Sequence, residues 1–173
     1  MNNFHLIQTC PSSGARAGEL ATPHGPIPTP VFLPVGSQGA VKTLTPEEVT
    51  DIGIKMVLAN TYHLYLRPGI EVVAKMGGLH KFMGWGGAIL TDSGGYQVFS
   101  LAPFCKVSED GVKFRSHIDG SEHFLTPELA IQYQETLGAD VIMVLDECSA
   151  YGESFEKIQK AMRRTHRWAE RCQ

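Results

Sequence analysis

The stretch Ala88-Ile-Leu-Thr91-Asp-Ser-Gly-Gly-Tyr-Gln97 joins a short apolar segment directly to a polar, glycine-rich loop. A short apolar run that ends in such a loop is typical of a strand buried on both faces of a parallel sheet. Three other apolar runs have the same character, and we expect them to be neighbouring strands: residues 30–35, 56–59 and 141–145.

Helical segments alternate with these runs. Thr45-Pro-Glu-Glu48 and Thr126-Pro-Glu128 each place a capping threonine before proline and acidic residues, the typical start of a helix. We expect two more helices over about 68–78 and 154–171. The alternating segment 112–117 is flanked by Asp-Gly turns and predicts an inserted β-hairpin. Together these elements predict an α/β fold with a parallel sheet, either doubly wound or a β/α barrel.

Composition limits the classes of protein to consider. The chain has 173 residues, 43% of them hydrophobic, and a formal charge of −3, so a single domain with a buried core is expected and a net basic surface is not. No apolar run approaches the roughly 20 residues that span a bilayer, so we expect a cytoplasmic protein with no membrane partner. The cysteines are widely scattered, which predicts free thiols and no metal site in this chain: Cys10, Cys105, Cys148 and Cys172.

Polar side chains follow three of the apolar runs, namely Asn60, Asp92 and Asp146. The carboxyl ends of parallel strands carry the ligand in both candidate architectures, so these side chains should meet at one mouth. Two carboxylates in one site can divide the work, one moving protons and one fixing a substrate. Each aspartate could instead be a helix cap or a loop anchor, and Asn60 could either orient Asp92 or simply form a turn.

The loop after Asp92 also suggests a ligand. Gly94 and Gly95 let the backbone approach a flat molecule, and Tyr96 could stack on an aromatic base; the alternative is a tight turn whose tyrosine fills the core. Asp92-Ser-Gly-Gly95 is similar to the nucleophile segment of trypsin-like serine proteases, which makes Ser93 a rival nucleophile. Those proteases are all-β and have a base histidine in an Ala-His-Cys setting, which this chain lacks.

The final predicted helix is locally basic. It could contact phosphate, or it could be a solvated outer helix with Met162 and Trp168 turned inward. Cys148 is expected to be a neutral residue lining the site. The basic residues of this helix are Lys157, Lys160, Arg163, Arg164, Arg167 and Arg171.

Several longer motifs make a specific resemblance. These motifs are Phe32-Leu-Pro-Val-Gly-Ser-Gln-Gly-Ala-Val-Lys-Thr-Leu-Thr-Pro46, Asn60-Thr-Tyr-His-Leu-Tyr-Leu-Arg-Pro-Gly69, Leu90-Thr-Asp-Ser-Gly-Gly-Tyr-Gln-Val-Phe-Ser-Leu101 and Leu145-Asp-Glu-Cys148. By these motifs, the chain from about Gly14 to Gln173 resembles the tRNA-guanine transglycosylases, also called queuine tRNA-ribosyltransferases.

The resemblance implies a fold and an activity. The fold is a TIM-like (β/α)8 barrel, of which residues 1–173 would form the N-terminal half, with an inserted β-hairpin, as one incomplete domain. The activity is exchange of guanine at the anticodon wobble position of tRNA for 7-aminomethyl-7-deazaguanine, in queuosine biosynthesis. Asp92 would be the general acid and base, Asp146 would read the Watson–Crick edge of guanine, and Tyr96 would stack on the base. The remaining matched pocket residues are Asn60, Ser93, Gly94, Gly95 and Cys148.

The resemblance also implies parts that this chain does not contain. Family members are about twice as long, and their second half carries a nucleophilic aspartate and a zinc subdomain of three cysteines and one histidine. We therefore expect no cofactor in this chain, zinc in the missing half, and a possible homodimer in the full-length form. The chain is predicted to be a fragment that is inactive alone; the alternative is a non-catalytic tRNA-binding or scaffold module of the same fold.

Overall fold

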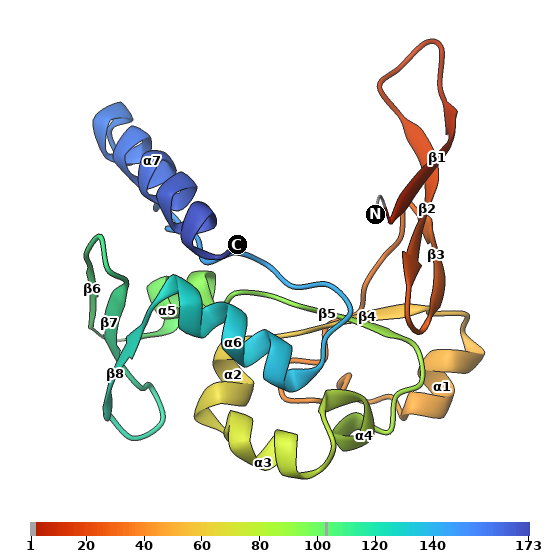
Figure 1. Cartoon of the computed structure of the whole chain (residues 1–173), viewed down its shortest axis with the longest axis horizontal. Helices are drawn as coiled ribbons and strands as arrows, with labels where there is room; N and C mark the ends of the chain where they lie inside the picture. The colour runs from red at the N-terminus through yellow and green to blue at the C-terminus, as the bar shows by residue number, and fades with distance from the viewer. Residues whose placement is uncertain (1–2, 103) are drawn as a thin grey trace.

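The computed structural model describes residues 3–102 and 104–173, which form a mixed α/β structure (Figure 1). The strands are β1 (Phe4–Thr9), β2 (Arg16–Thr22), β3 (Gly25–Thr29), β4 (Met56–Ala59), β5 (Ala88–Thr91), β6 (Cys105–Val107), β7 (Val112–Arg115) and β8 (Glu122–Leu125). The helices are α1 (Pro46–Asp51), α2 (Thr61–Leu66), α3 (Ile70–Lys75), α4 (Leu79–Met83), α5 (Gly95–Leu101), α6 (Pro127–Leu137) and α7 (Phe155–Arg171).

The centre of the structure is a parallel pair of strands. β4 and β5 pair in register from Met56 opposite Ala88 to Ala59 opposite Thr91, which confirms the two strands expected there. Single parallel bridges extend the pair on both sides, from Val35 to Leu58 and from Val141 to Leu90. The four parallel segments therefore lie side by side in the order in which they occur along the chain.

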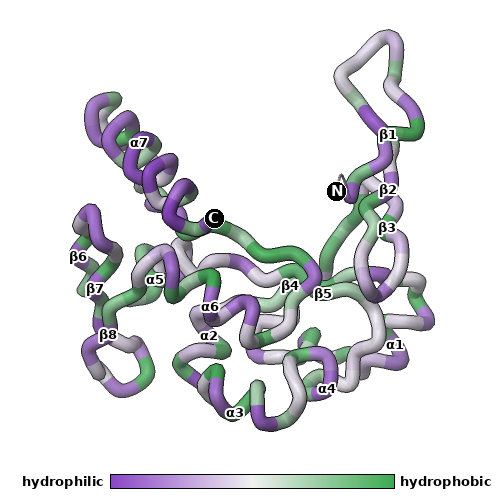
Figure 2. Tube along the Cα trace, viewed as in Figure 1, coloured by the Kyte–Doolittle hydropathy of each residue, from purple (hydrophilic) through white to green (hydrophobic). Residues whose placement is uncertain are grey.

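The two outer segments are not the full strands that the sequence predicts. In 30–35, Pro30 and Pro34 have no N–H to donate, so pairing is confined to a short contact with Leu58. In 141–145, the side chain of Gln134 takes both backbone groups of Met143, accepting from its N–H and donating to its carbonyl at 2.8 Å. Segment 141–145, which is apolar (Figure 2), is therefore held at Met143 by hydrogen bonds to a side chain and not by hydrogen bonds to a neighbouring strand.

The predicted helix starts at Thr45, Thr126 and Ser154 are confirmed, since each side chain accepts a hydrogen bond from the backbone of the first turn. The helix expected over about 68–78 is confirmed as α3, which begins at Ile70 and ends at Lys75, just before Gly77 and Gly78. The neighbouring helices α2 and α4 were not predicted.

Two antiparallel sheets flank the parallel segments. β7 pairs with both β6 and β8, at the place where the sequence predicts a hairpin. The sheet β1–β2–β3 was not predicted, and its β1–β2 end extends away from the rest of the chain (Figure 1). Every residue of β1 is exposed, so this strand lacks the buried alternation that reveals strands in a sequence.

The buried core lies around β4 and β5 and beneath α7. Trp168 of α7 is fully buried, and its indole N–H donates to the backbone carbonyl of Glu109 at 2.8 Å. Met162 is 49% exposed, so the expectation that it turns inward is wrong. Among the residues described, no helix is both long and apolar enough to cross a bilayer.

Candidate functional site

Asp92 lies immediately after β5, and four N–H groups converge on its carboxylate. Oδ1 accepts from the backbone of Thr61 at 3.0 Å and of Gly94 at 3.2 Å. Oδ2 accepts from the side-chain amides of Asn60 at 2.5 Å and Gln97 at 3.0 Å. Asp92 therefore anchors the first turn of α2 and the loop before α5, while keeping its carboxylate at the end of the sheet.

Asp146 is held beside this loop by Ser93. The Ser93 hydroxyl donates to Asp146 Oδ1 at 3.2 Å and accepts from the Gly95 N–H at 3.2 Å. A Cβ on Gly95 would lie 2.7 Å from the Asp146 backbone oxygen, so this position requires glycine. Since the Ser93 hydroxyl bridges the loop to Asp146, and no histidine hydrogen-bonds it among the described residues, the serine-hydrolase reading has no support.

One pocket of about 270 Å³ brings most of the predicted site residues together. Tyr96 is 62% exposed at its rim, so the alternative that this tyrosine fills the core is wrong. Asn60 lies behind Asp92 and is 7% exposed, while Cys148 lines an adjoining pocket that Tyr96 also borders. The pocket is lined by Asp92, Ser93, Gly94, Gly95, Tyr96, Gln97, Met143, Val144 and Asp146.

Gln97 is a site residue that the sequence did not single out. Its amide nitrogen binds Asp92, whereas its Oε1 is buried without a hydrogen-bond partner. The available signal was its spacing, because a side chain five residues beyond Asp92, in the first turn of the following helix, can reach back to the aspartate.

Histidines and tyrosines form a layer next to Asp92. The Tyr62 hydroxyl hydrogen-bonds His117 Nδ1 at 2.8 Å, and the two rings stack. Burial lowers the pKa of His63, His117 lowers it further, and Asp92 opposes the change. These surroundings therefore favour the uncharged imidazole of His63.

The basic charge of α7 is largely used inside the chain. Arg164 and Arg167 both bind Glu109, and Arg164 also binds Glu147. The Glu147 N–H donates to Thr165 at 3.0 Å, so α7 fixes the segment that carries Asp146. Arg164 and Thr165 thus hold the segment beside the pocket, and the internal ion pairs of α7 weaken the interpretation that this helix binds phosphate.

Comparison with known proteins places the chain in a family. The family model described as queuine tRNA-ribosyltransferase matches residues 10–173. The chain belongs to the queuine tRNA-ribosyltransferase family. The resemblance inferred from the sequence motifs is therefore confirmed.

Relatives named queuine tRNA-ribosyltransferase are similar along nearly the whole chain. The protein from Pelotomaculum thermopropionicum is 63% identical over 98% of this chain, and that from Dehalococcoides mccartyi strain 195 is 60% identical over 98%. The matched region is 46% and 43% of the length of these two relatives. The chain thus spans less than half the length of the relatives it matches.

Proposed function

We propose that this chain forms the base-recognising half of a glycosyltransferase that exchanges guanine at the anticodon wobble position of tRNA for a 7-deazaguanine base. The observation that carries the proposal is the pocket at the end of β5, where Asp92 and Asp146 share one cavity with the exposed ring of Tyr96. A flat base with hydrogen-bond donors on one edge suits this combination.

Asp146 is the residue proposed to recognise guanine. Among the described residues, the Ser93 hydroxyl donates to Oδ1 of its side chain, and the carboxylate keeps further acceptor capacity. The N1–H and exocyclic amine of guanine can both donate to it, an arrangement that adenine cannot reproduce. A buried acceptor left without a donor costs about 1–3 kcal/mol, which is the source of discrimination.

Tyr96 and Asp92 have complementary proposed roles. The target base has to leave the anticodon stack to reach the pocket, and stacking on Tyr96 repays part of that energy. Asp92 is proposed to move the proton of the departing and entering bases. Because its oxygens already accept four hydrogen bonds, a base that approaches it would displace the side-chain amide of Gln97 rather than the backbone donors.

A TIM-like barrel is the proposed architecture of the complete protein. Successive strands of such a barrel are neighbours in chain order, as are the four parallel segments here. Met143 and Val144 of the fourth segment are 46% and 38% exposed, as expected of a strand that further chain would cover. The β6–β8 sheet would then be the insertion, and residues 1–173 would be one part of a single barrel domain.

Zinc belongs to the proposed remainder of the protein. The four cysteines of this chain are free and come from separate segments, so they do not fit a site of three cysteines and one histidine. The cytoplasmic location and the homodimer also remain predictions for the full-length protein.

Base binding by the chain itself tests the proposal most directly. We expect guanine to bind more tightly than adenine by isothermal titration calorimetry, and Asp146→Ala to abolish the difference. Asp51→Ala, which removes an exposed carboxylate on α1, is the matched control and should leave it intact. Equal binding of the two bases, or discrimination that survives Asp146→Ala, would overturn the assignment.

An assay of guanine exchange into tRNA distinguishes the two readings of this chain, as part of an enzyme or as a non-catalytic scaffold. The chain alone should not incorporate labelled guanine into unmodified tRNA, whereas mixing it with the remaining part of the Pelotomaculum relative should restore incorporation. Asp92→Asn should abolish exchange in the mixture while leaving guanine affinity within about tenfold, or roughly 1.4 kcal/mol. tRNA binding without exchange in the mixture would favour the scaffold reading, and exchange by the chain alone would contradict the fragment reading.

A further inference from the structure

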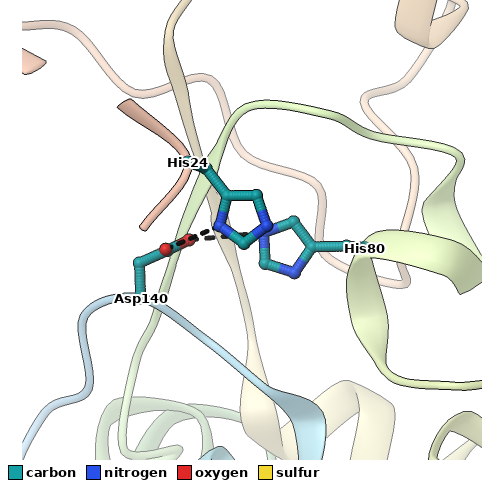
Figure 3. Close-up of side chains that lie close together, drawn as sticks. All are labelled: His24, His80 and Asp140. Atoms are coloured by element: carbon teal, nitrogen blue, oxygen red, sulfur yellow. Dashed lines mark hydrogen bonds and ion pairs between the residues drawn. The ribbon is translucent and has the colours of Figure 1, made fainter. Parts of the chain in front are cut away.

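His24, His80 and Asp140 meet at the end of β5 opposite the pocket (Figure 3). His24 lies in the turn between β2 and β3, His80 in α4, and Asp140 shortly after α6. His24 Nδ1 is 2.7 Å from Asp140 Oδ1, and His80 Nε2 is 3.3 Å from Asp140 Oδ2. Three segments that are distant in sequence thus place two imidazoles around one carboxylate.

The carboxylate is deeply buried, and its only ion-pairing partners among the described residues are these two histidines. The Asp140 side chain is 1% exposed, and Oδ2 also accepts a hydrogen bond from the Ile89 N–H at 2.8 Å. His80 Nε2 is itself buried and makes no hydrogen bond of good geometry. A buried carboxylate needs a positive partner, because isolated charge is costly away from water.

We propose that His24, His80 and Asp140 bind a divalent transition-metal ion of the zinc type, which fastens the β1–β3 sheet to the rest of the chain. Two imidazoles and one carboxylate are a donor set that Zn²⁺ accepts, with bonds of about 2.0–2.2 Å. The three ligand atoms already lie within 4.8 Å of one another. The Ile89 N–H orients the carboxylate, as hydrogen bonds around metal ligands generally do.

Metal binding requires one local change. The rings of His24 and His80 stack with centroids 3.8 Å apart and planes 16° from parallel, whereas an imidazole binds a metal in its own plane. His24 is the more exposed of the two, at 37% against 16%, so it is the ring that turns. A pocket of about 390 Å³ that His24 and Gly87 line adjoins the cluster and gives the ion and a completing water a way in.

This site is separate from the proposed zinc subdomain of the family, since it contains no cysteine. The scattered cysteines of the sequence predict no metal in this chain, and that expectation is what the proposal replaces. His24 and Asp140 are 116 residues apart, so no local spacing marks them as ligands.

The test uses the whole chain, stripped of metal with a chelator and titrated with Zn²⁺ and Co²⁺. We expect one ion per chain, ligand-field absorption of Co²⁺ without the thiolate charge transfer that cysteine ligands give, and a melting midpoint that rises with Zn²⁺ concentration. His24→Ala should weaken binding at least roughly tenfold. His166→Ala removes an exposed histidine of α7 and should leave the affinity unchanged.

A second measurement does not depend on any variant folding. In histidine-selective NMR of the unmodified chain, Co²⁺ should broaden the His24 and His80 ring signals first. Equal affinity of His24→Ala and His166→Ala, or broadening at other histidines first, would overturn the proposal. A stability that changes with pH but not with Zn²⁺ concentration would also overturn it. In that case a proton on the histidines, and not a metal ion, would be the positive partner of Asp140.

Discussion

Removing the Asp92 carboxylate should destabilise the chain itself, independently of catalysis. In Asp92→Ala, the backbone N–H groups of Thr61 and Gly94 lose their acceptor, and neither can turn away because both residues are buried. Each buried donor left unpaired costs about 1–3 kcal/mol, whereas the side-chain amides of Asn60 and Gln97 can find new partners. We therefore expect the two unpaired donors together to lower the free energy of unfolding by about 2–6 kcal/mol.

Asp92→Asn should cost far less. Its oxygen can keep the two backbone donors, and its amide can donate to Asn60 and Gln97 if those side chains flip by 180°. Gln97 Oε1 is buried without a partner, so for this residue the flip gains an acceptor role. The flip moves the Gln97 amide nitrogen to the partnerless position that its oxygen now holds, so one unpaired acceptor is exchanged for one unpaired donor. We therefore expect a net change of about 1 kcal/mol, well below that of alanine.

Urea denaturation followed by the fluorescence of Trp85 and Trp168, which are 5% and 0% exposed, measures both changes. Asp51→Ala is again the matched control. Asparagine as damaging as alanine at position 92 would refute the reasoning, because charge rather than donor pairing would then hold the loop. No effect of alanine would show that the carboxylate does not organise α2 and the loop.

Two further predictions concern packing and pH. Gly95→Ala should cost about 1–3 kcal/mol and weaken guanine binding, because the new Cβ lies 2.7 Å from the Asp146 backbone oxygen. Gly86→Ala meets nothing within 4 Å and should stay within about 0.5 kcal/mol in the same urea experiment, so equal losses would contradict the packing argument. The hydrogen bonds from Arg171 lower the pKa of Glu128 from 4.5 to about 2, so this pair stabilises the fold above pH 4.5 and loses that effect as pH falls toward 2. In Glu128→Gln, the free energy of unfolding should fall by at most about 1 kcal/mol less between pH 4.5 and 2, since the pair is exposed. An unchanged dependence of stability on pH would contradict this role of the Glu128–Arg171 pair.

The sequence predicts elements whose signals are local. Thr45 and Thr126 cap helices by bonds within one turn, and β4 and β5 are apolar because both of their faces are covered. Segment 141–145 carries the same apolar signal, yet Gln134 takes the backbone groups of Met143, which no periodicity reveals. The sheet β1–β3 escapes prediction because β1 is exposed throughout.

The candidate site also has a part that the sequence predicts and a part that it does not. Parallel strands that end at one edge predict that Asp92 and Asp146 meet in one pocket, as the structure has them. The bridge that Ser93 forms between the loop and Asp146 depends on the path of α5, which the sequence does not define. His24 and Asp140 touch only once the fold is complete, so no motif could have paired them.

Hydrogen bonds within this chain hold both carboxylates of the candidate site in place. The donors to Asp92 come from the segments directly beyond β4 and β5, and Asp146 is held by Ser93 and, through Glu147, by α7. All of these partners lie within this chain, so both carboxylates are positioned before anything covers the exposed side of 141–145. If the proposed function is right, further chain adds reacting groups to a pocket whose two carboxylates are already held in place, so base selectivity should be measurable without exchange.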